Sequence, residues 1–549
     1  MRLQSQEYFL GSRLSQLPPT WAKRITRVHS EIASCYVHEI NAINPEFAAL
    51  RAANLALLDV TDRLNASSTP LDASDDCICL LAVQRAKACS EYARIAGSYD
   101  TQHALMVDFV GRFGLLSPNK KISTLGSIRR MEDAIWWRRG LRSQHAAHVE
   151  QSAITLGYVS RQSEIYVSDE SVRRRRAQNA RNTRTLAQTN MVSDTGQCAT
   201  LADLASTGVG NKSIRRAELM TRISGFELIA RDLHHDGIFL TLTCPSRMHR
   251  YLSVAKDRVV KNSKYDETTP RDAQRYLSVL YARVRAQLAR HDIGIYGFRI
   301  AEPHHDGCPH WHLLLFCEPA HSESVISIFR SHALRDSPDE SGAADHRLTS
   351  IRIDWSRGTA AGYIAKYVSK NIDGLHIESD LYGNPSMETS QRVEAWATTW
   401  RIRQFQQVGG PPVGVWRELR RIESLPASAS QALRDAHAAV NRTGDDDDLH
   451  RASWAEYCIA QGGVFCGRKN LIRLEKRASV ELGRYGDEIP PRPIGVSVTE
   501  TVLDWFGMIP NWPTLVTHVY ESVRHVWRRA GGGRSFLLPQ RSCGSLGLV

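Results

Sequence analysis

Residues 302–312 bring together three side chains that can bind a metal ion. The stretch contains Glu302, His310 and His312, and it continues into an apolar tail that ends near Phe316. His310 and His312 bracket a single residue, and side chains in an extended strand alternate between its two faces. We therefore expect both imidazoles to lie on the same face of one strand.

The preceding segment, residues 294–302, also has the pattern of a strand, and Asp306-Gly307 is a turn signal between the two segments. In the resulting hairpin, Glu302 lies opposite His310, and such opposed residues have Cβ atoms about 4.5–5.5 Å apart. Two imidazoles and a carboxylate around one point suit a divalent metal with open coordination positions. A His-x-His pair also occurs as ordinary surface histidines, so the pair alone leaves both interpretations open.

A second group of reactive side chains lies in residues 362–371, which have a helical pattern. Tyr363 and Tyr367 are four residues apart, so both phenols project from the same face of the helix. Lys366 and Lys370 each follow a tyrosine by three residues and lie close to that face. A tyrosine pair at this spacing is also typical of core packing. The two lysines are harder to bury, and they suit a site that handles phosphodiesters.

The composition describes a basic, globular chain. Its 549 residues include 70 Lys and Arg against 58 Asp and Glu, which gives a net charge of +12. This balance favours a polyanionic partner such as nucleic acid, although an ordinary basic surface gives the same total. The 11 cysteines follow no pairing or zinc-binding pattern, and there is neither a signal peptide nor a run of ~20 apolar residues. We expect a soluble cytoplasmic protein that does not enter a membrane.

The order of elements predicts an α+β chain in four parts. Residues 1–150 form a mostly helical accessory region, and residues 151–230 a basic helical segment. Residues 231–421 alternate strands and helices, as in an antiparallel sheet covered by helices, with a basic and aromatic extension. Residues 422–549 form a linker and a C-terminal region that is partly disordered, including a tail of low structural signal.

Two further segments could contact nucleic acid. The run Arg173–Arg176 could meet phosphates or form a solvated surface, and residues 396–421 could stack bases or simply pack. The glycines of residues 208–213 have the wrong spacing for a phosphate-binding loop. We therefore expect no NTP-driven helicase within the chain.

Three motifs stand in a fixed order: a strand with the sequence Phe-Leu-Thr-Leu-Thr, the His-x-His strand and the Tyr-x-x-x-Tyr helix. This order is similar to the rolling-circle replication initiators of the HUH endonuclease superfamily, in the form with two catalytic tyrosines. More closely, the chain resembles the phage replication gene A protein family, from about residue 130 to 421. The segments that carry this resemblance are residues 136–139, 239–249, 301–316, 363–371 and 400–406.

The resemblance implies an HUH-type central antiparallel sheet flanked by helices, and an endonuclease that nicks one strand of a replication origin. Tyr363 or Tyr367 would attack the DNA, leaving a free 3′-OH and a 5′-phosphotyrosine intermediate. The 3′-OH would prime a host polymerase. The second tyrosine would allow strand transfer, so that the same enzyme initiates and terminates rolling-circle replication of phage DNA.

By the same resemblance, Glu302, His310 and His312 would hold Mg²⁺ or Mn²⁺, which would polarise and orient the scissile phosphate. Lys366 and Lys370 would neutralise charge that develops on phosphate oxygens. The implied partners are origin DNA, single-stranded at the nick, together with a host helicase and polymerase in the bacterial cytoplasm. The alternative is a non-catalytic origin-binding or regulatory DNA-binding protein whose histidines serve packing or structural zinc.

Overall fold

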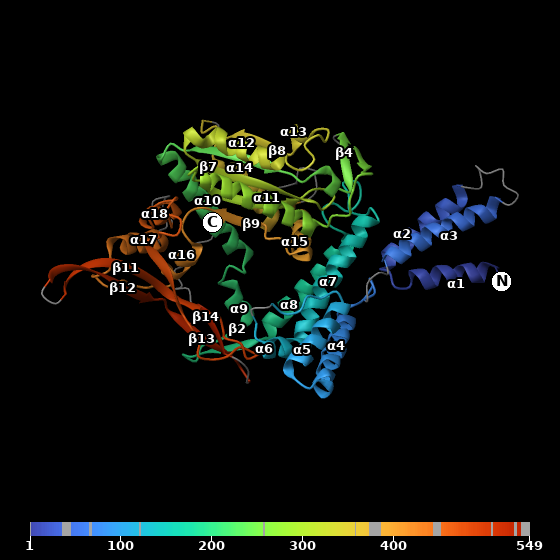
Figure 1. The fold of residues 1–549 in the computed structure, drawn as a ribbon, viewed down its shortest axis with the longest axis horizontal. Coiled ribbons are helices and arrows are strands. Elements are labelled where there is room, and N and C mark those ends of the chain that lie inside the picture. The colour runs from blue at the N-terminus through green and yellow to red at the C-terminus, as the bar shows by residue number, and fades with distance from the viewer. Residues whose placement is uncertain are drawn as a thin grey trace. The chain divides into compact units, whose positions relative to one another are not determined.

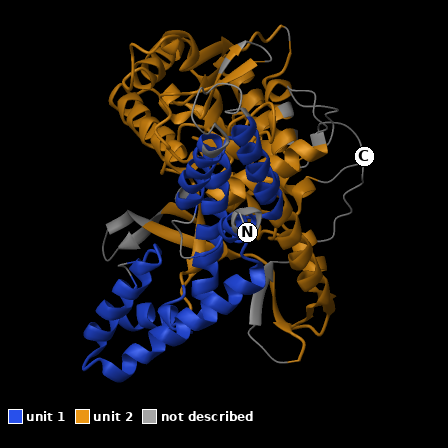
Figure 2. Ribbon diagram, turned by 90° about the vertical axis from the view of Figure 1, so that its right-hand side faces the viewer, with its two compact units in different colours: residues 1–159, 168–171, 480–489 blue, residues 160–167, 172–479, 490–549 orange. Residues whose placement is uncertain are grey.

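The computed structural model describes residues 2–35, 45–64, 69–119, 122–255, 258–356, 358–372, 386–442, 452–506, 509–531 and 535–539. The chain divides into two compact units (Figure 2). Unit 1 comprises residues 1–159, 168–171 and 480–489, and unit 2 comprises residues 160–167, 172–479 and 490–549.

Unit 1 is built from helices. Their N-termini are well specified, because the side chains of Ser74, Ser98 and Ser123 each accept a hydrogen bond from a backbone N–H of the first turn. The centre of one helical cluster is Trp137, a fully buried ring in edge-to-face contact with Phe109. The helices are α1 (Arg2–Leu14), α2 (Pro19–Cys35), α3 (Pro45–Leu64), α4 (Asp75–Ile95), α5 (Tyr99–Arg112), α6 (Thr124–Met131) and α7 (Ala134–Thr155).

Unit 2 is organised around a five-stranded antiparallel sheet with the strand order β8-β3-β7-β6-β9. Figure 1 labels three of its strands, β7, β8 and β9. The sequence prediction of an antiparallel sheet with covering helices is thereby confirmed. The strands of this sheet are β3 (Asp236–Leu242), β6 (Tyr296–Pro303), β7 (Pro309–Cys317), β8 (Leu348–Arg352) and β9 (Phe405–Val408).

Alternation along the strands gives the sheet two apolar faces. Phe239, Phe298 and Leu314 belong to a core that also contains residues of α10 (Lys212–Asp232) and α14 (Ala360–Ile372). On the other face, Trp311 packs against Tyr281 of α11 (Pro270–Arg290). Tyr281 in turn contacts α12 (Ser322–Ala333). Because neighbouring residues of one strand point to opposite faces, α14 and α11 cover opposite faces of the sheet.

Strand β6 contains a glycine at a point where the backbone of strand β7 leaves no room for a side chain. Gly297 has a φ of +142°, and a Cβ atom there would collide with the carbonyl oxygen of Leu314. The β6–β7 pairing continues without interruption from this point to the pair Glu302 and His310. The hairpin register predicted from the sequence is confirmed.

Besides a two-stranded pair formed by residues 251–255 and 258–261, the described part of unit 2 includes two larger further sheets, and the sequence pattern predicted none of the three. One of the larger sheets has the order β14-β13-β1-β2, so that strands from the two ends of the unit are neighbours, and the other has the order β10-β11-β12. These strands are β1 (Asn190–Ser193), β2 (Cys198–Thr200), β10 (Ile472–Arg477), β11 (Arg492–Phe506), β12 (Ile509–Glu521), β13 (Arg524–Arg529) and β14 (Ser535–Pro539).

For residues 422–549 the sequence predicts a linker and a partly disordered C-terminal region, and the described part of this region contains the strands β10 to β14. Residues 540–549, the end of the expected tail, lie outside the described part of the chain. The remaining elements are α8 (Asp169–Gln188), which begins in unit 1 and continues into unit 2, α9 (Leu201–Ser206), η1 (Ser246–Met248), β4 (Tyr251–Ala255), β5 (Arg258–Lys261), η2 (Pro319–His321), α13 (Ala343–His346), α15 (Ser386–Trp400), α16 (Val413–Leu419), α17 (Gln431–Asn441) and α18 (Trp454–Ala460).

Candidate active site

Strands β6 and β7 bring Glu302, His310 and His312 to one point. Glu302 pairs directly with His310 across the two strands, and His312 lies two residues further on the same face. The ligand-type atoms of the three side chains all lie within 4.8 Å of one another. Glu302 and His312 are buried, and His310 is partly buried. The structure thus assembles the three residues that the sequence predicts as metal ligands.

The two imidazoles face each other through their Nε2 atoms, which are 3.0 Å apart. The other nitrogen of His312, Nδ1, lies 3.0 Å from the hydroxyl of Thr241 on strand β3. This contact can fix the ring orientation and the tautomer of a ligating histidine. Burial, together with the nearby His304 and His312, holds the pKa of His310 well below its ordinary value. A neutral imidazole is the form that binds a metal.

The donor set fits a divalent ion. Two cis ligands at ~2.1 Å from an octahedral ion lie about 3.0 Å apart, which matches the separation of the two Nε2 atoms. Glu302 is held in place by two donors: Lys370 Nζ lies 3.0 Å from its Oε2, and Asn371 donates to its Oε1. Each carboxylate oxygen has two lone pairs, so both hydrogen bonds leave acceptor capacity for an ion.

Helix α14 carries the two tyrosines. One stripe of the helix, including Ile364 and Val368, is completely buried in the core beneath the sheet. The helix begins at a defined place because Glu227 of α10 accepts a hydrogen bond of 2.8 Å from the backbone N–H of Ala361. Tyr367 directly precedes Val368 and lies at the border of the buried stripe, half-buried in contact with the core.

The two phenols have different surroundings. The ring of Tyr367 lies against His312, with 4.3 Å between the ring centroids, and it stacks on Phe239 at 5.6 Å. Burial and the nearby carboxylate of Glu302 raise the pKa of Tyr367 to about 12. Tyr363 lies one turn earlier, is 46% exposed and contacts Phe239 at 5.9 Å. One tyrosine therefore lies beside the predicted metal ligands, and the other faces solvent.

The two predicted lysines differ in what the structure describes. Lys370 is mostly buried and forms its ion pair with Glu302, and its Nζ lies 4.9 Å from the ring centroid of Tyr166. The ammonium group is therefore engaged with a predicted metal ligand rather than pointing into open solvent. Lys366 lies on the same helix, but its side chain is outside the described part of the structure.

A row of buried polar side chains extends from the site along the connection between β6 and β7. The ring of His304 lies 4.1 Å from that of His310, and the ring of His249 lies 5.0 Å from His304. His249 contacts the buried carboxylate of Asp306 at 3.1 Å. Burial and the neighbouring His249 lower the pKa of His304 to about 3, so this imidazole is neutral. The predicted turn is present, with Gly307 at a φ of +84°.

Sequence comparison with known proteins assigns the chain to a family. The model of the bacteriophage replication gene A protein matches residues 116–375. The chain is 41% identical over 369 residues to the replication gene A protein of Escherichia phage 186. The aligned residues make up 66% of this chain and 52% of that protein. The chain belongs to the phage replication gene A protein family. This finding confirms the resemblance that the sequence motifs indicate.

Other relatives extend the comparison. The replication gene A protein of Escherichia phage P2 is 36% identical over 383 residues, which cover 67% of this chain and 49% of that protein. A probable replication endonuclease from a prophage-like region of Salmonella typhimurium is 33% identical over 370 residues, covering 66% and 45%. The chain spans about half the length of these curated relatives. The search of solved structures finds no match. Within the described residues, no helix combines the length and apolar character that a membrane crossing needs.

The phage replication gene A family match contains every residue of the predicted site, but sequence reasoning missed several residues that support it. Asn371 holds Glu302 and is itself held by Gln404, whose amide donates to it at 2.9 Å. Asn371 stands beside Lys370 in the tyrosine motif, and Thr241 shares a strand face with Phe239, so the sequence contained a signal for both. Tyr166 lies far from the motifs in sequence. Gln404 lies within residues 400–406, which carry the family resemblance, but nothing in the local pattern indicates its contact with Asn371.

Proposed function

We propose that this member of the phage replication gene A family is a site- and strand-specific DNA endonuclease that uses a tyrosine nucleophile. The observation that carries the proposal is the contact between Tyr367 and His312, 4.3 Å between ring centroids, at the edge of the cluster formed with Glu302 and His310. The names of its relatives support it, because one is called a probable replication endonuclease and others replication gene A proteins.

In the proposed reaction, the phenolic oxygen of a tyrosine attacks the scissile phosphorus in line with the leaving group. A new P–O bond forms to the tyrosine while the bond from phosphorus to the 3′ oxygen breaks. The phenol loses one proton and the leaving 3′ oxygen gains one, so the step is balanced. The products are a 5′-phosphotyrosine and a free 3′-OH. Because the ester retains the bond energy, rejoining requires no nucleotide.

Glu302, His310 and His312 would hold a divalent metal, Mg²⁺ or Mn²⁺, and its Lewis acidity would polarise the scissile phosphate. His310 and His312 present their Nε2 atoms to one point, and Lys370 and Asn371 fix the carboxylate. We propose that Lys370 positions Glu302 and that it also contributes positive charge near the phosphate, as Lys366 would from the preceding turn.

Two tyrosines on one helix face would let one enzyme both start and finish a replication round. While one phenol holds the old 5′ end, the other can cut the newly made origin, and the free 3′-OH resolves the first ester. We propose that the sheet and helix α14 form an HUH-type nuclease core. The proposed setting is rolling-circle replication of phage DNA in the bacterial cytoplasm, with a host helicase opening the duplex and a host polymerase extending the 3′ end.

The test uses the purified chain and labelled single-stranded oligonucleotides tiled across its own gene and the neighbouring sequence. Reactions contain Mg²⁺ or Mn²⁺, with EDTA as the control, and are resolved on a denaturing gel. We expect a metal-dependent protein–DNA band that survives denaturation and is absent from the double variant Tyr363→Phe/Tyr367→Phe. Binding without a covalent product across the full tiling and with both metals would instead identify a non-catalytic DNA-binding protein.

A further inference from the structure

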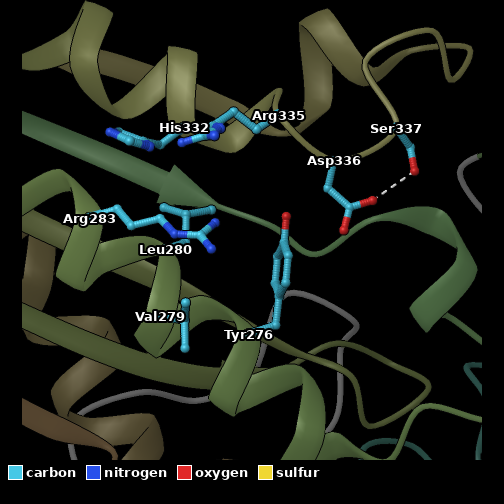
Figure 3. Close-up of a pocket in the computed structure, with 8 residues that line it drawn as sticks. All are labelled: Tyr276, Val279, Leu280, Arg283, His332, Arg335, Asp336 and Ser337. Carbon is cyan, nitrogen blue, oxygen red and sulfur yellow. Dashed lines mark hydrogen bonds between the residues drawn. The ribbon is translucent and has the colours of Figure 1, made fainter.

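A pocket of about 450 Å³ lies between α11 and α12, beside the loop that follows α12 (Figure 3). The two helices supply most of its walls, and the loop supplies the remainder. Its lining combines cationic, hydroxyl and apolar groups. The lining residues are Tyr276, Val279, Leu280, Arg283, His332, Arg335, Asp336 and Ser337.

The pocket is positively charged. Arg283 and Arg335 are exposed, and within the described part of the chain their guanidinium groups form no ion pair and no hydrogen bond. His332 accepts or donates one hydrogen bond through Nε2, to Gln287 at 2.8 Å, while its buried Nδ1 has no partner among the described residues. Burial, followed by the charges of Arg335 and Arg283, lowers the pKa of His332. The lowered pKa favours the uncharged form of His332, so Arg283 and Arg335 supply the positive charge of the pocket.

The one acidic residue of the lining does not cancel these charges. The carboxylate of Asp336 already accepts from Arg247 at 2.8 Å and from the Ser337 hydroxyl at 2.8 Å. Burial raises the pKa of Tyr276 to about 12, so its phenol keeps its proton at neutral pH. Tyr276 projects into the pocket from α11 (Figure 3) and offers a hydroxyl donor there. The uncompensated groups are all of the kind that binds an anion.

The size and chemistry of the pocket fit a nucleotide unit better than a bare anion. Guanidinium groups bind phosphate oxygens with two parallel hydrogen bonds. Val279 and Leu280 supply apolar surface, and Tyr276 a ring, for a sugar or a base. A volume of about 450 Å³ exceeds the space that a single phosphate group fills and lies within the range of about 300–1,000 Å³ that is typical of small-molecule pockets.

The pocket belongs to the sheet face away from the tyrosines. Helix α11 packs on Trp311, whose neighbours His310 and His312 point to the other face, where Tyr367 of α14 lies. A strand held at this pocket is therefore bound separately from the phosphate at the proposed nicking site. Such a site would hold single-stranded DNA away from the tyrosines.

We propose that the α11–α12 pocket binds a nucleotide unit of single-stranded DNA, with Arg283 and Arg335 holding its backbone phosphate. This inference rests on the proposed function, because it gives the nuclease a second contact with its DNA. A nucleotide in a duplex is stacked and paired, so a pocket of this kind selects a single strand.

The test is a salt titration of the full 549-residue chain binding to a 5′-fluorescein oligothymidylate, followed by anisotropy. For single-stranded DNA, the binding constant K falls with salt, and each phosphate that the protein neutralises adds about −0.7 to the slope of log K against log salt. We expect the double variant Arg283→Gln/Arg335→Gln to make this slope less steep by up to about 1.4, because two phosphate contacts are lost. The matched control is Arg94→Gln/Arg112→Gln, which removes the same net charge from exposed arginines that are ion-paired within their own helices. The control should keep the wild-type slope.

Two further arms decide the source of the phosphate. Competition by inorganic phosphate and by thymidine 5′-monophosphate should be weak compared with oligothymidylate. Equal slopes for the wild type and Arg283→Gln/Arg335→Gln would overturn the inference, as would tight monophosphate binding that the variant loses while DNA binding is unchanged. Failure of the proposed function is distinguishable, because it would show as a wild-type chain that forms no covalent adduct with any tiled oligonucleotide while the slope difference persists.

Discussion

At the scale of single residues, the site separates two chemically identical phenols by their surroundings. Tyr367 stacks beside His312, whereas Tyr363 is 46% exposed and lies one helical turn away. A nucleophile must reach the phosphorus that the Glu302, His310 and His312 cluster would orient, and Tyr367 is the phenol beside that cluster. In the proposed reaction, the two tyrosines would therefore act in different steps.

Replacing each tyrosine alone should separate these steps. We expect Tyr367→Phe to reduce the first covalent adduct at least about a thousandfold, because the nucleophile is removed. Tyr363→Phe should still form that adduct but should fail to transfer it to a second origin oligonucleotide. Each single variant is the matched control for the other on denaturing gels with labelled DNA. First-step adduct at the wild-type rate in Tyr367→Phe would reverse the assignment.

A residue outside the predicted ligand set should also affect metal use. The hydroxyl of Thr241 lies 3.0 Å from Nδ1 of His312, and partners of this kind typically contribute 10–100-fold to metal affinity. We expect Thr241→Val to raise the Mn²⁺ concentration for half-maximal adduct formation by about that factor, with the maximal adduct at saturating Mn²⁺ largely retained. The control is Thr243→Val, whose hydroxyl donates to the backbone of His346 instead. An unchanged Mn²⁺ requirement would remove Thr241 from the site.

At the scale of elements, hydrogen bonds from helix α15 fix the position of the turn beside the site and of two neighbouring helices. Helix α15 holds the turn between β6 and β7, because Trp396 donates a hydrogen bond of 2.8 Å to the carbonyl of Gly307. The same helix is tied to α8 and α10 through Glu394, which accepts from Arg175, Asn179 and Lys212. The arginine run of α8 is therefore partly a structural feature. Arg173 and Arg176 of the same run are exposed, so both sequence interpretations, a phosphate contact and a solvated surface, stay open for them.

Glu394 gives this junction a pH dependence. Burial would raise the pKa of its carboxyl, but the hydrogen bonds from Lys212 and Asn179 and the charges of Lys212 and Arg175 lower it to about 2. A folded pKa below the ordinary value of 4.5 means that the stabilisation is complete above about pH 4.5 and is lost as the pH falls toward 2.

We expect Glu394→Gln to lower the free energy of local opening of α15 by about 1–3 kcal/mol at pH 7, because charged hydrogen bonds are lost. The difference from the wild type should shrink at pH 3. Hydrogen exchange of the α15 amides measures both values. Glu388→Gln is the control on the same helix, since Glu388 is half-exposed and its contact with Arg392 is longer, at 3.5 Å. Equal exchange of the two variants at pH 7 would contradict this role.

The strand and helix patterns around the site were readable from the sequence because they are local. Alternation placed His310 and His312 on one face, and the turn signal at Asp306-Gly307 placed Glu302 opposite His310. The helical spacing placed Tyr363 and Tyr367 together. The supporting contacts were not readable, because Tyr166, Gln404 and Glu394 act across more than thirty residues of sequence, and their local patterns resemble those of ordinary polar or aromatic positions.

At the scale of the whole molecule, the five-stranded sheet has its own apolar support, independent of any ion. The side chains of Phe298 and Leu314 project from one face of the sheet into a core shared with α10 and α14, and Trp311 is buried on the other face. The strands β10 to β14, which the sequence did not predict, add paired structure around this core. The pairing of β1 with β13 joins segments that lie far apart in the sequence, so no local pattern indicates it, whereas β10 to β12 and β13 to β14 pair between consecutive strands.

This construction predicts that chelation should stop the chemistry without unfolding the chain. We expect EDTA to abolish the covalent adduct while the thermal unfolding midpoint changes by less than about 2 °C, because no apolar core depends on the three ligands and only ligand-linked stabilisation would be lost. Circular dichroism melts with and without EDTA measure the midpoint, and re-addition of Mn²⁺ should restore the adduct. A structural zinc site would behave differently, since its free energy of binding is part of the free energy of folding. Loss of the folded signal on chelation would therefore assign Glu302, His310 and His312 to holding the fold together.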